Sequence, residues 1–161
     1  KPVGIVLDLR GNPGGLLDSA VQIGSYFVPE GNILIERYKD GSEELHPRQG
    51  RYLLNRIPLV VLVDGGSASA SEIVAGAIQD AGTGILIGEK TYGKGSVQLS
   101  NVLSDDSQLK ITIARWFTPK DRAIHGQGLE PDIVVPFTAE DREAERDPQL
   151  DRAVEYLLQG K

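Results

Sequence analysis

The sequence predicts an α/β fold with a mainly parallel sheet, antiparallel hairpins and a C-terminal helix. Two apolar runs rich in β-branched residues, 3–9 and 59–63, each lead through a glycine-rich turn into a segment with apolar side chains at helical spacing. Two such strand-loop-helix units in series imply parallel strands joined by right-handed crossovers. Residues 97–103 and 109–117 alternate around a polar turn at 104–106, which predicts an antiparallel pair.

Local patterns predict the elements between these runs. Apolar side chains recur at helical spacing over residues 16–27 and again over residues 73–81, which predicts two helices. Residues 32–38 and 43–46 flank a glycine-containing turn, so they are expected to form a hairpin at an edge. Residues 84–88 follow the second helix and predict a third short strand.

The end of the chain predicts a further helix. Asp147 suits the N-cap, Pro148 the first turn and Gly160 the position beyond the helix end. The charge-dense stretch 138–146 before it predicts a solvated linker. The apolar face of this helix is expected to consist of Leu150, Ala153, Val154, Leu157 and Leu158.

Composition excludes several classes of protein. The 161 residues suit one compact domain or a large piece of a bigger protein, and 40% apolar with 25% charged residues is ordinary for a soluble globular chain. A net charge of −6 without a basic stripe argues against a nucleic-acid or anionic-membrane partner. The longest apolar runs fall far short of the roughly 20 residues that span a bilayer.

The missing residue types are also informative. The chain contains no cysteine, which excludes disulfides, a thiol nucleophile and thiolate metal sites. It contains no methionine and opens at Lys1 with a strand-like run close behind, so we expect it to be a segment of a longer protein.

A serine-rich turn, residues 67–72, is the first candidate for chemistry. It lies between a buried strand and a helix, at the end of a parallel sheet where ligands bind. A helix N-terminus stabilises negative charge, and the amide after a nucleophilic serine can donate to an oxyanion. Ser69 and Glu72 also match a capping box, and the local pattern alone favours that structural role.

A glycine-rich loop, residues 88–96, is the second candidate. It resembles a phosphate-binding loop, but Gly95 stands where the Mg²⁺-binding hydroxyl should be and a strand follows instead of a helix. What remains is Lys94, bracketed by Gly93 and Gly95. It is either an ordinary exposed lysine or a general base, and the latter requires burial to lower its pKa from about 10.4. The flanking glycines would let the backbone pack closely and help bury the amine.

A serine nucleophile needs a base, and the sequence offers three kinds. His46 lies in the predicted outer hairpin, His125 lies in a loop, and a lysine is the third possibility. A Ser-His-Asp triad therefore stays open at this point. No pair of carboxylates with acid-base spacing and no histidine-rich cluster is evident, so neither a metal nor a cofactor is expected.

Several ordered motifs together resemble the carboxyl-terminal processing proteases, also called tail-specific proteases. The resemblance extends over almost the whole chain, and agreement of many motifs in order is more specific than any one of them. The motifs are DLRGNPGG at 8–15, GSASASEI at 66–73, GEKTYGKGSVQ at 88–98, FTP at 117–119, GQGLEPDI at 126–133 and DPQL at 147–150.

The resemblance implies a crotonase-like serine endopeptidase that cleaves proteins near their C-terminal tails through a Ser/Lys dyad. It assigns the nucleophile to Ser69 and the general base to Lys94, 25 positions later. Gln98 matches the third catalytic position, which orients the base. The oxyanion donors would be the amides of Gly15 and Ala70, and the serines at 67 and 71 would be flanking residues.

The resemblance also sets expectations for organisation and partners. The family's N-terminal anchor, PDZ domain and first part of the core have no counterpart in residues 1–161, which are therefore expected to be a single protease-core domain lacking those parts. The implied partners are polypeptides with free C-termini, and the implied location is the cell envelope (periplasm or extracytoplasmic face) or a thylakoid lumen. The alternative is an inactive core acting as a peptide-binding or scaffold module, with homodimers through an exposed sheet edge.

Overall fold

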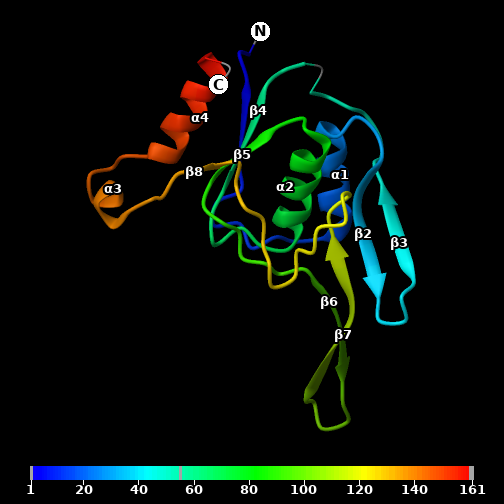
Figure 1. Ribbon diagram of the computed structural model, residues 1–161. Helices are drawn as coiled ribbons and strands as arrows, with labels where there is room; N and C mark the ends of the chain where they lie inside the picture. Colours follow the sequence, from blue (N-terminus) through cyan, green and yellow to red (C-terminus); the bar gives the residue numbers. More distant parts are fainter. Residues whose placement is uncertain (1, 55, 160–161) are drawn as a thin grey trace.

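A fully buried strand, β4 (Leu59–Val63), lies at the centre of the fold. The computed structural model describes residues 2–54 and 56–159 (Figure 1). In it β4 pairs in parallel with β1 (Ile5–Asp8) and β5 (Ile85–Gly88), and β8 (Ile133–Val134) extends the sheet beyond β5. The predicted parallel arrangement is confirmed. The sequence did not predict β8, because two residues are too few to show a strand period.

The side chains of β4 alternate between two apolar layers. Leu59, Val61 and Val63 point into the larger core, with helices α1 (Leu17–Phe27) and α2 (Ala70–Ala81). Val60 and Leu62 belong to a second cluster on the other face, together with α4 (Pro148–Gln159). Full burial of each such side chain stabilises the fold by about 1.5–3 kcal/mol. The sheet is therefore covered on both faces, as parallel sheets require.

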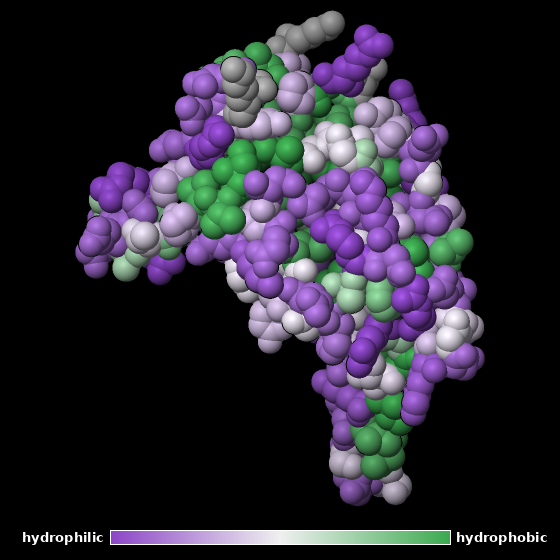
Figure 2. Space-filling view, in the orientation of Figure 1, coloured by the Kyte–Doolittle hydropathy of each residue, from purple (hydrophilic) through white to green (hydrophobic). Residues whose placement is uncertain are grey.

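A second sheet is antiparallel, in the order β3–β2–β7–β6. The β2–β3 hairpin, Asn32–Tyr38 with Glu43–Pro47, lies at its edge as the sequence predicts. Strands β6 (Ser96–Val102) and β7 (Gln108–Phe117) form a hairpin that protrudes from the body of the molecule (Figure 1). Figure 2 shows apolar side chains gathered on this hairpin, and the exposed ones are Leu99, Val102, Leu103, Leu109 and Ile111.

The stretch predicted as a solvated linker contains a short helix, α3 (Ala139–Glu143). Thr138 caps it, and the Asp141 carboxylate accepts hydrogen bonds from the amide and hydroxyl of Thr138. None of its residues is buried. Capping rather than apolar burial forms this helix, so hydrophobic periodicity gave no sign of it. No helix in the described part of the chain has the length and apolar character needed to cross a membrane.

Helix α4 buries a different face from the one predicted. Ala153 and Leu157 pack on the sheet as expected, whereas Leu150, Val154 and Leu158 are exposed. The reason is that polar Gln149 is fully buried: its amide donates to the Val135 carbonyl at 2.8 Å and its oxygen accepts from Arg10 at 3.0 Å. These bonds rotate the helix relative to its apolar stripe. The predicted end at Gly160 lies outside the described residues.

Arg10 ties the end of β1 to the start of α4. Its guanidinium donates to both carboxylate oxygens of Asp147 at 2.8 Å and to Asp8 at 2.8 and 3.0 Å. Asp147 in turn accepts from the Leu150 amide at 3.0 Å, which confirms it as the N-cap. The hydrogen bonds from Arg10 lower the pKa of Asp147. Partial burial raises the pKa of Asp8, but the bonds from Arg10 more than offset it.

The Arg10–Asp147 pair predicts a loss of stability in acid. Asp147→Asn keeps the N-cap function but removes the charge, so at pH 7 it should lower the free energy of unfolding by about 1 kcal/mol, a small value because the carboxylate is partly screened. A lowered folded-state pKa stabilises the fold above about pH 4 and ceases to do so as pH falls through that pKa. Urea denaturation at pH 7 and pH 3 should show the difference between the two proteins shrinking in acid. A pH-independent difference would contradict this assignment.

Candidate active site

Ser69 lies at the junction between the β4 turn and helix α2 in a strained conformation. Its φ of 57° and ψ of −118° place a non-glycine residue at positive φ. Such backbone costs about 1–3 kcal/mol and persists where the surrounding structure enforces it, often at functional sites. Ser69 and Glu72 form the predicted capping box, so the structural role is confirmed.

The turn is fixed to the first glycine-rich loop by several hydrogen bonds. The Asn12 carbonyl accepts from the Ala68 amide and from the Ser71 hydroxyl, both at 3.0 Å. The Ser67 hydroxyl donates to the Leu9 carbonyl at 2.8 Å. The two flanking serines therefore have structural roles. Within the described residues the Ser69 hydroxyl donates no hydrogen bond, which leaves its proton available to a base.

The predicted oxyanion donors lie in closely packed backbone. Gly14 has a φ of +98°, and a Cβ placed there would lie 2.7 Å from the Ala70 nitrogen, so only glycine fits. This contact brings the first loop against the N-terminus of α2. Among the described residues neither the Gly15 nor the Ala70 amide has a hydrogen-bond partner. Both line a cavity of about 330 Å³ whose other walls include Leu16, Ile23 and Val74.

Glu72 connects the serine turn to the lysine loop. Its carboxylate is fully buried and accepts four hydrogen bonds. The donors are the Ser69 amide at 2.9 Å, the Thr91 hydroxyl at 2.5 Å, the Gly93 amide at 2.7 Å and the Lys94 amide at 2.8 Å. The sequence pattern revealed only the bond to Ser69. The other three join residues about 20 positions apart, and no local signal predicts them.

The glycines beside Lys94 pack as expected, but its side chain does not become buried. A Cβ on Gly95 would lie 2.5 Å from the His125 nitrogen, and one on Gly93 would lie 3.0 Å from the Gly128 nitrogen. The Lys94 backbone is thus held in place while its side chain is exposed in this chain. Among the described residues no hydrogen bond joins the Lys94 amine to the Ser69 hydroxyl.

Gln98, His46 and His125 lie on different elements of the structure. Gln98 is exposed on β6, opposite Thr112 and next to a register shift. His46 lies on β3 within 3.3 Å of a Glu36 carboxylate oxygen. The His125 backbone packs against Gly95, with an exposed side chain. Within the described residues neither imidazole hydrogen-bonds Ser69, so the structure gives no support to a Ser-His-Asp triad.

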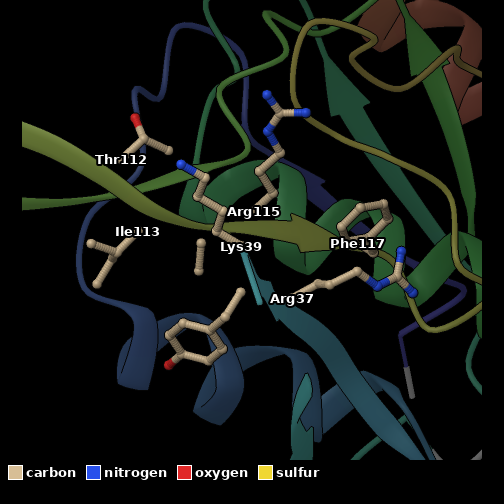
Figure 3. Close-up of a pocket in the computed structure, with 8 residues that line it drawn as sticks. Arg37, Lys39, Thr112, Ile113, Arg115 and Phe117 are labelled. Atoms are coloured by element: carbon tan, nitrogen blue, oxygen red, sulfur yellow. The ribbon is translucent and has the colours of Figure 1, made fainter. Parts of the chain in front are cut away.

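Another cavity, of about 450 Å³, lies on the antiparallel sheet. Arg37, Lys39 and Arg115 line it beside Phe117, and Figure 3 shows the Arg37 side chain next to that ring. The guanidinium carbon lies 4.1 Å from the ring centroid. None of the predicted catalytic or oxyanion residues lines this cavity.

Comparison with known proteins decides the family. Residues 1–135 match Peptidase family S41. The chain belongs to peptidase family S41. Over 132 residues the S41 chain is 46% identical to the carboxyl-terminal-processing protease of Synechocystis sp., covering 82% of this chain and 31% of that relative. It is 42% identical over 131 residues to the carboxy-terminal processing protease CtpA of Bacillus subtilis, covering 81% of this chain and 28% of that one.

Solved structures agree with this assignment. The photosystem II D1 C-terminal processing protease superposes with a TM-score of 0.78 at 38% identity, covering 83% of this chain and 35% of that one. Mature CPAF complexed with lactacystin superposes with a TM-score of 0.81 and covers 45% of that chain, but at 16% identity it shows the fold alone. The predicted family and fold class are confirmed. The S41 chain spans about a third or less of the two curated relatives' length.

Replacing Glu72 should destabilise the S41 chain strongly. In Glu72→Gln one carboxylate oxygen becomes an NH₂ group facing amide donors, so the free energy of unfolding should fall by about 2–4 kcal/mol in urea denaturation. Glu130→Gln is the matched control, because the Glu130 carboxylate is exposed and, among the described residues, pairs with Lys90 alone, at 2.6 Å. That change should stay within about 0.5 kcal/mol. Equal effects of the two variants would show that Glu72 does not hold the loops together.

Proposed function

We propose that the S41 chain is the catalytic core of a C-terminal processing serine protease with a Ser69/Lys94 dyad. The observation that carries the proposal is the Glu72 carboxylate, which bonds to the backbone amides of both Ser69 and Lys94. This carboxylate holds the backbones of the proposed nucleophile and the proposed base close to one another, which supports the proposal. The strained φ of Ser69 and the two amides beside it are the other parts that acyl transfer requires.

The reaction proceeds through an acyl-enzyme. The neutral Lys94 amine takes the Ser69 proton as the serine oxygen bonds to the carbonyl carbon of the scissile peptide, and the carbonyl π electrons move to oxygen. The Gly15 and Ala70 amides donate to that oxyanion. When the C–N bond breaks, Lys94 gives its proton to the leaving amine, and water then hydrolyses the ester by the reverse sequence.

Substrate binding provides a physical reason for a neutral lysine. A polypeptide that covers the exposed Lys94 side chain would remove water from the amine and disfavour its charged form. Gln98, four positions along the chain, would orient the amine. Both roles are proposals that rest on the family resemblance and on the fixed backbone of the lysine loop.

The cavity next to the oxyanion amides is the proposed site for a substrate side chain. Because it is lined by Gly15 and Ala70 together with Leu16, Ile23 and Val74, a carbonyl held by the two amides would have an apolar wall beside it. An apolar side chain next to the scissile bond fits this surface.

The dyad predicts which variants lose activity. Ser69→Ala and Lys94→Ala should each reduce kcat/KM for an unstructured protein tail by at least about 10³-fold, because each removes a group that acts in the bond-making step. His125→Ala is the control for a competing base and should keep cleavage close to the unmodified level. The variants are compared with an unmodified chain that cleaves the tail, and mass spectrometry of the products measures the cleavage.

Activity that persists in Lys94→Ala would overturn the dyad, and activity lost in His125→Ala would identify a different base. A scaffold function predicts another outcome, in which the unmodified chain binds a tail peptide without cutting it.

Location in the cell envelope or a thylakoid lumen remains a proposal from the resemblance. Pairing of two copies remains a proposal from the exposed sheet edges, among them β3 and β6.

Filling the apolar cavity should change substrate preference. Ser19 lines the cavity and is exposed, so Ser19→Trp can project an indole into it without disturbing the core. We expect kcat/KM to fall about tenfold or more for tails with a large apolar residue before the cut, and less for alanine. Gln22→Trp places the same side chain on an exposed position of α1 that does not line the cavity, and should leave both rates unchanged. If Ser19→Trp lowered kcat/KM equally for both kinds of tail, the result would argue against this cavity as the site for the substrate side chain.

A further inference from the structure

Three potential metal ligands gather on the β2–β3 hairpin, away from the residues proposed for catalysis. Glu36 on β2 stands directly opposite Glu44 on β3, and His46 lies two residues further along β3. Residues two apart on a strand share a face, as do directly paired residues, so all three side chains project from the same side of the hairpin. The sequence did not reveal this group, because its members meet only when the hairpin register is known.

The spacing of the ligand atoms suits a shared ion. One ligand atom from each residue lies within 4.8 Å of the other two. The His46 Nε2 is 3.3 Å from a Glu36 carboxylate oxygen, longer than a typical charge-assisted hydrogen bond of about 2.7–2.9 Å. Two ligand atoms at about 2.0–2.1 Å from a tetrahedral Zn²⁺ ion are separated by about 3.3 Å. For comparison with the 3.3 Å between His46 and Glu36, the neighbouring ion pair Arg37–Glu43 is joined at 2.6 Å.

The charges of the group call for a cation. Directly opposed carboxylates repel one another, and Glu36 is only 5% exposed, so its charge has little water around it. Within residues 2–54 and 56–159, neither Glu36 nor Glu44 pairs with a lysine or arginine. Among the described residues, His46 contacts Glu36, and the Tyr38 hydroxyl donates to Glu44 at 3.2 Å and also interacts with Glu36.

We propose that Glu36, Glu44 and His46 bind a divalent transition-metal ion, with Zn²⁺ as the best fit. One imidazole and two carboxylates are a donor set that Zn²⁺ accepts, and three protein ligands leave a fourth position for water. Tyr38 then orients Glu44 from outside the coordination sphere. Glu44 is exposed and His46 half-buried, so the ion has a route from solvent.

The ion would cross-link two strands of the antiparallel sheet. It would join β2 to the edge strand β3, and β2 pairs in turn with β7. Strand β7 supports the lysine loop, because the Trp116 amide donates to the Gly95 carbonyl at 2.9 Å. The site is independent of the proposed dyad and does not require the chain to cleave peptides.

Calorimetric titration of the full chain with ZnCl₂ in a non-chelating buffer tests the site. We expect saturable binding of one ion per chain, a higher melting temperature with Zn²⁺ and no comparable effect of MgCl₂. Glu44→Gln and His46→Ala should each weaken Zn²⁺ binding at least tenfold. His125→Ala is the matched control, since it removes the chain's other histidine and should leave the affinity unchanged.

Several results would overturn the proposal. These are the absence of saturable binding, an affinity unchanged in both Glu44→Gln and His46→Ala, or an affinity lost in His125→Ala. Circular dichroism of the metal-free proteins separates misfolding from ligand loss, and Glu44→Gln changes an exposed side chain and so should retain the fold. Failure of this test would leave the proposed dyad untouched, because the titration measures metal affinity and melting temperature rather than cleavage.

Discussion

The arrangement of the site depends on one buried carboxylate. Glu72 is inaccessible to water, so its charge is tolerated only because four donors point at it. Three of those donors belong to the loop of residues 91–94, which has no regular secondary structure of its own. The cost of leaving this carboxylate unsatisfied is what holds the loop against the start of α2. The same bond network supports the strained φ of Ser69, which stores energy that the surrounding contacts must offset.

Backbone contacts, rather than side chains, set the remaining geometry. Gly14 packs against Ala70, and Gly95 packs against His125, at distances that no Cβ could occupy. The first contact brings the loop of Gly15 against the start of α2, so that Gly15 and Ala70 line one cavity, and the second fixes the path of the chain through Lys94. Glycine at these positions removes steric bulk, which lets two loops from distant parts of the sequence meet at one edge of the parallel sheet.

The sequence predicted the elements whose formation is driven by burial. Strand β4 and helix α2 have continuous apolar patterns because neighbours cover them on nearly every side, and both were predicted correctly. Helix α3 depends on a cap, and the buried face of α4 depends on hydrogen bonds to Gln149, so apolar patterns failed for both. At the site, motif order assigned Ser69 and Lys94 to one site, and the structure joins their backbone amides to the same Glu72 carboxylate. Motif order did not predict the exposure of Lys94 or the additional donors to Glu72, because both depend on how the loops fold across one another.

Capping does not compete with the catalytic role proposed for Ser69, although the local sequence pattern presents the two as alternatives. The capping box uses the Ser69 amide, which donates to Glu72, and the carboxylate that accepts it also holds the lysine loop. The proposed acyl transfer would use the serine hydroxyl proton, which no described group accepts. The Ser-x-x-Glu pattern therefore specifies a helix start and, through the same glutamate, the position of the proposed base. A Ser-x-x-Glu capping pattern after a buried parallel strand is thus compatible with a nucleophilic serine. The condition is that the glutamate is buried and accepts hydrogen bonds from further donors besides the serine amide.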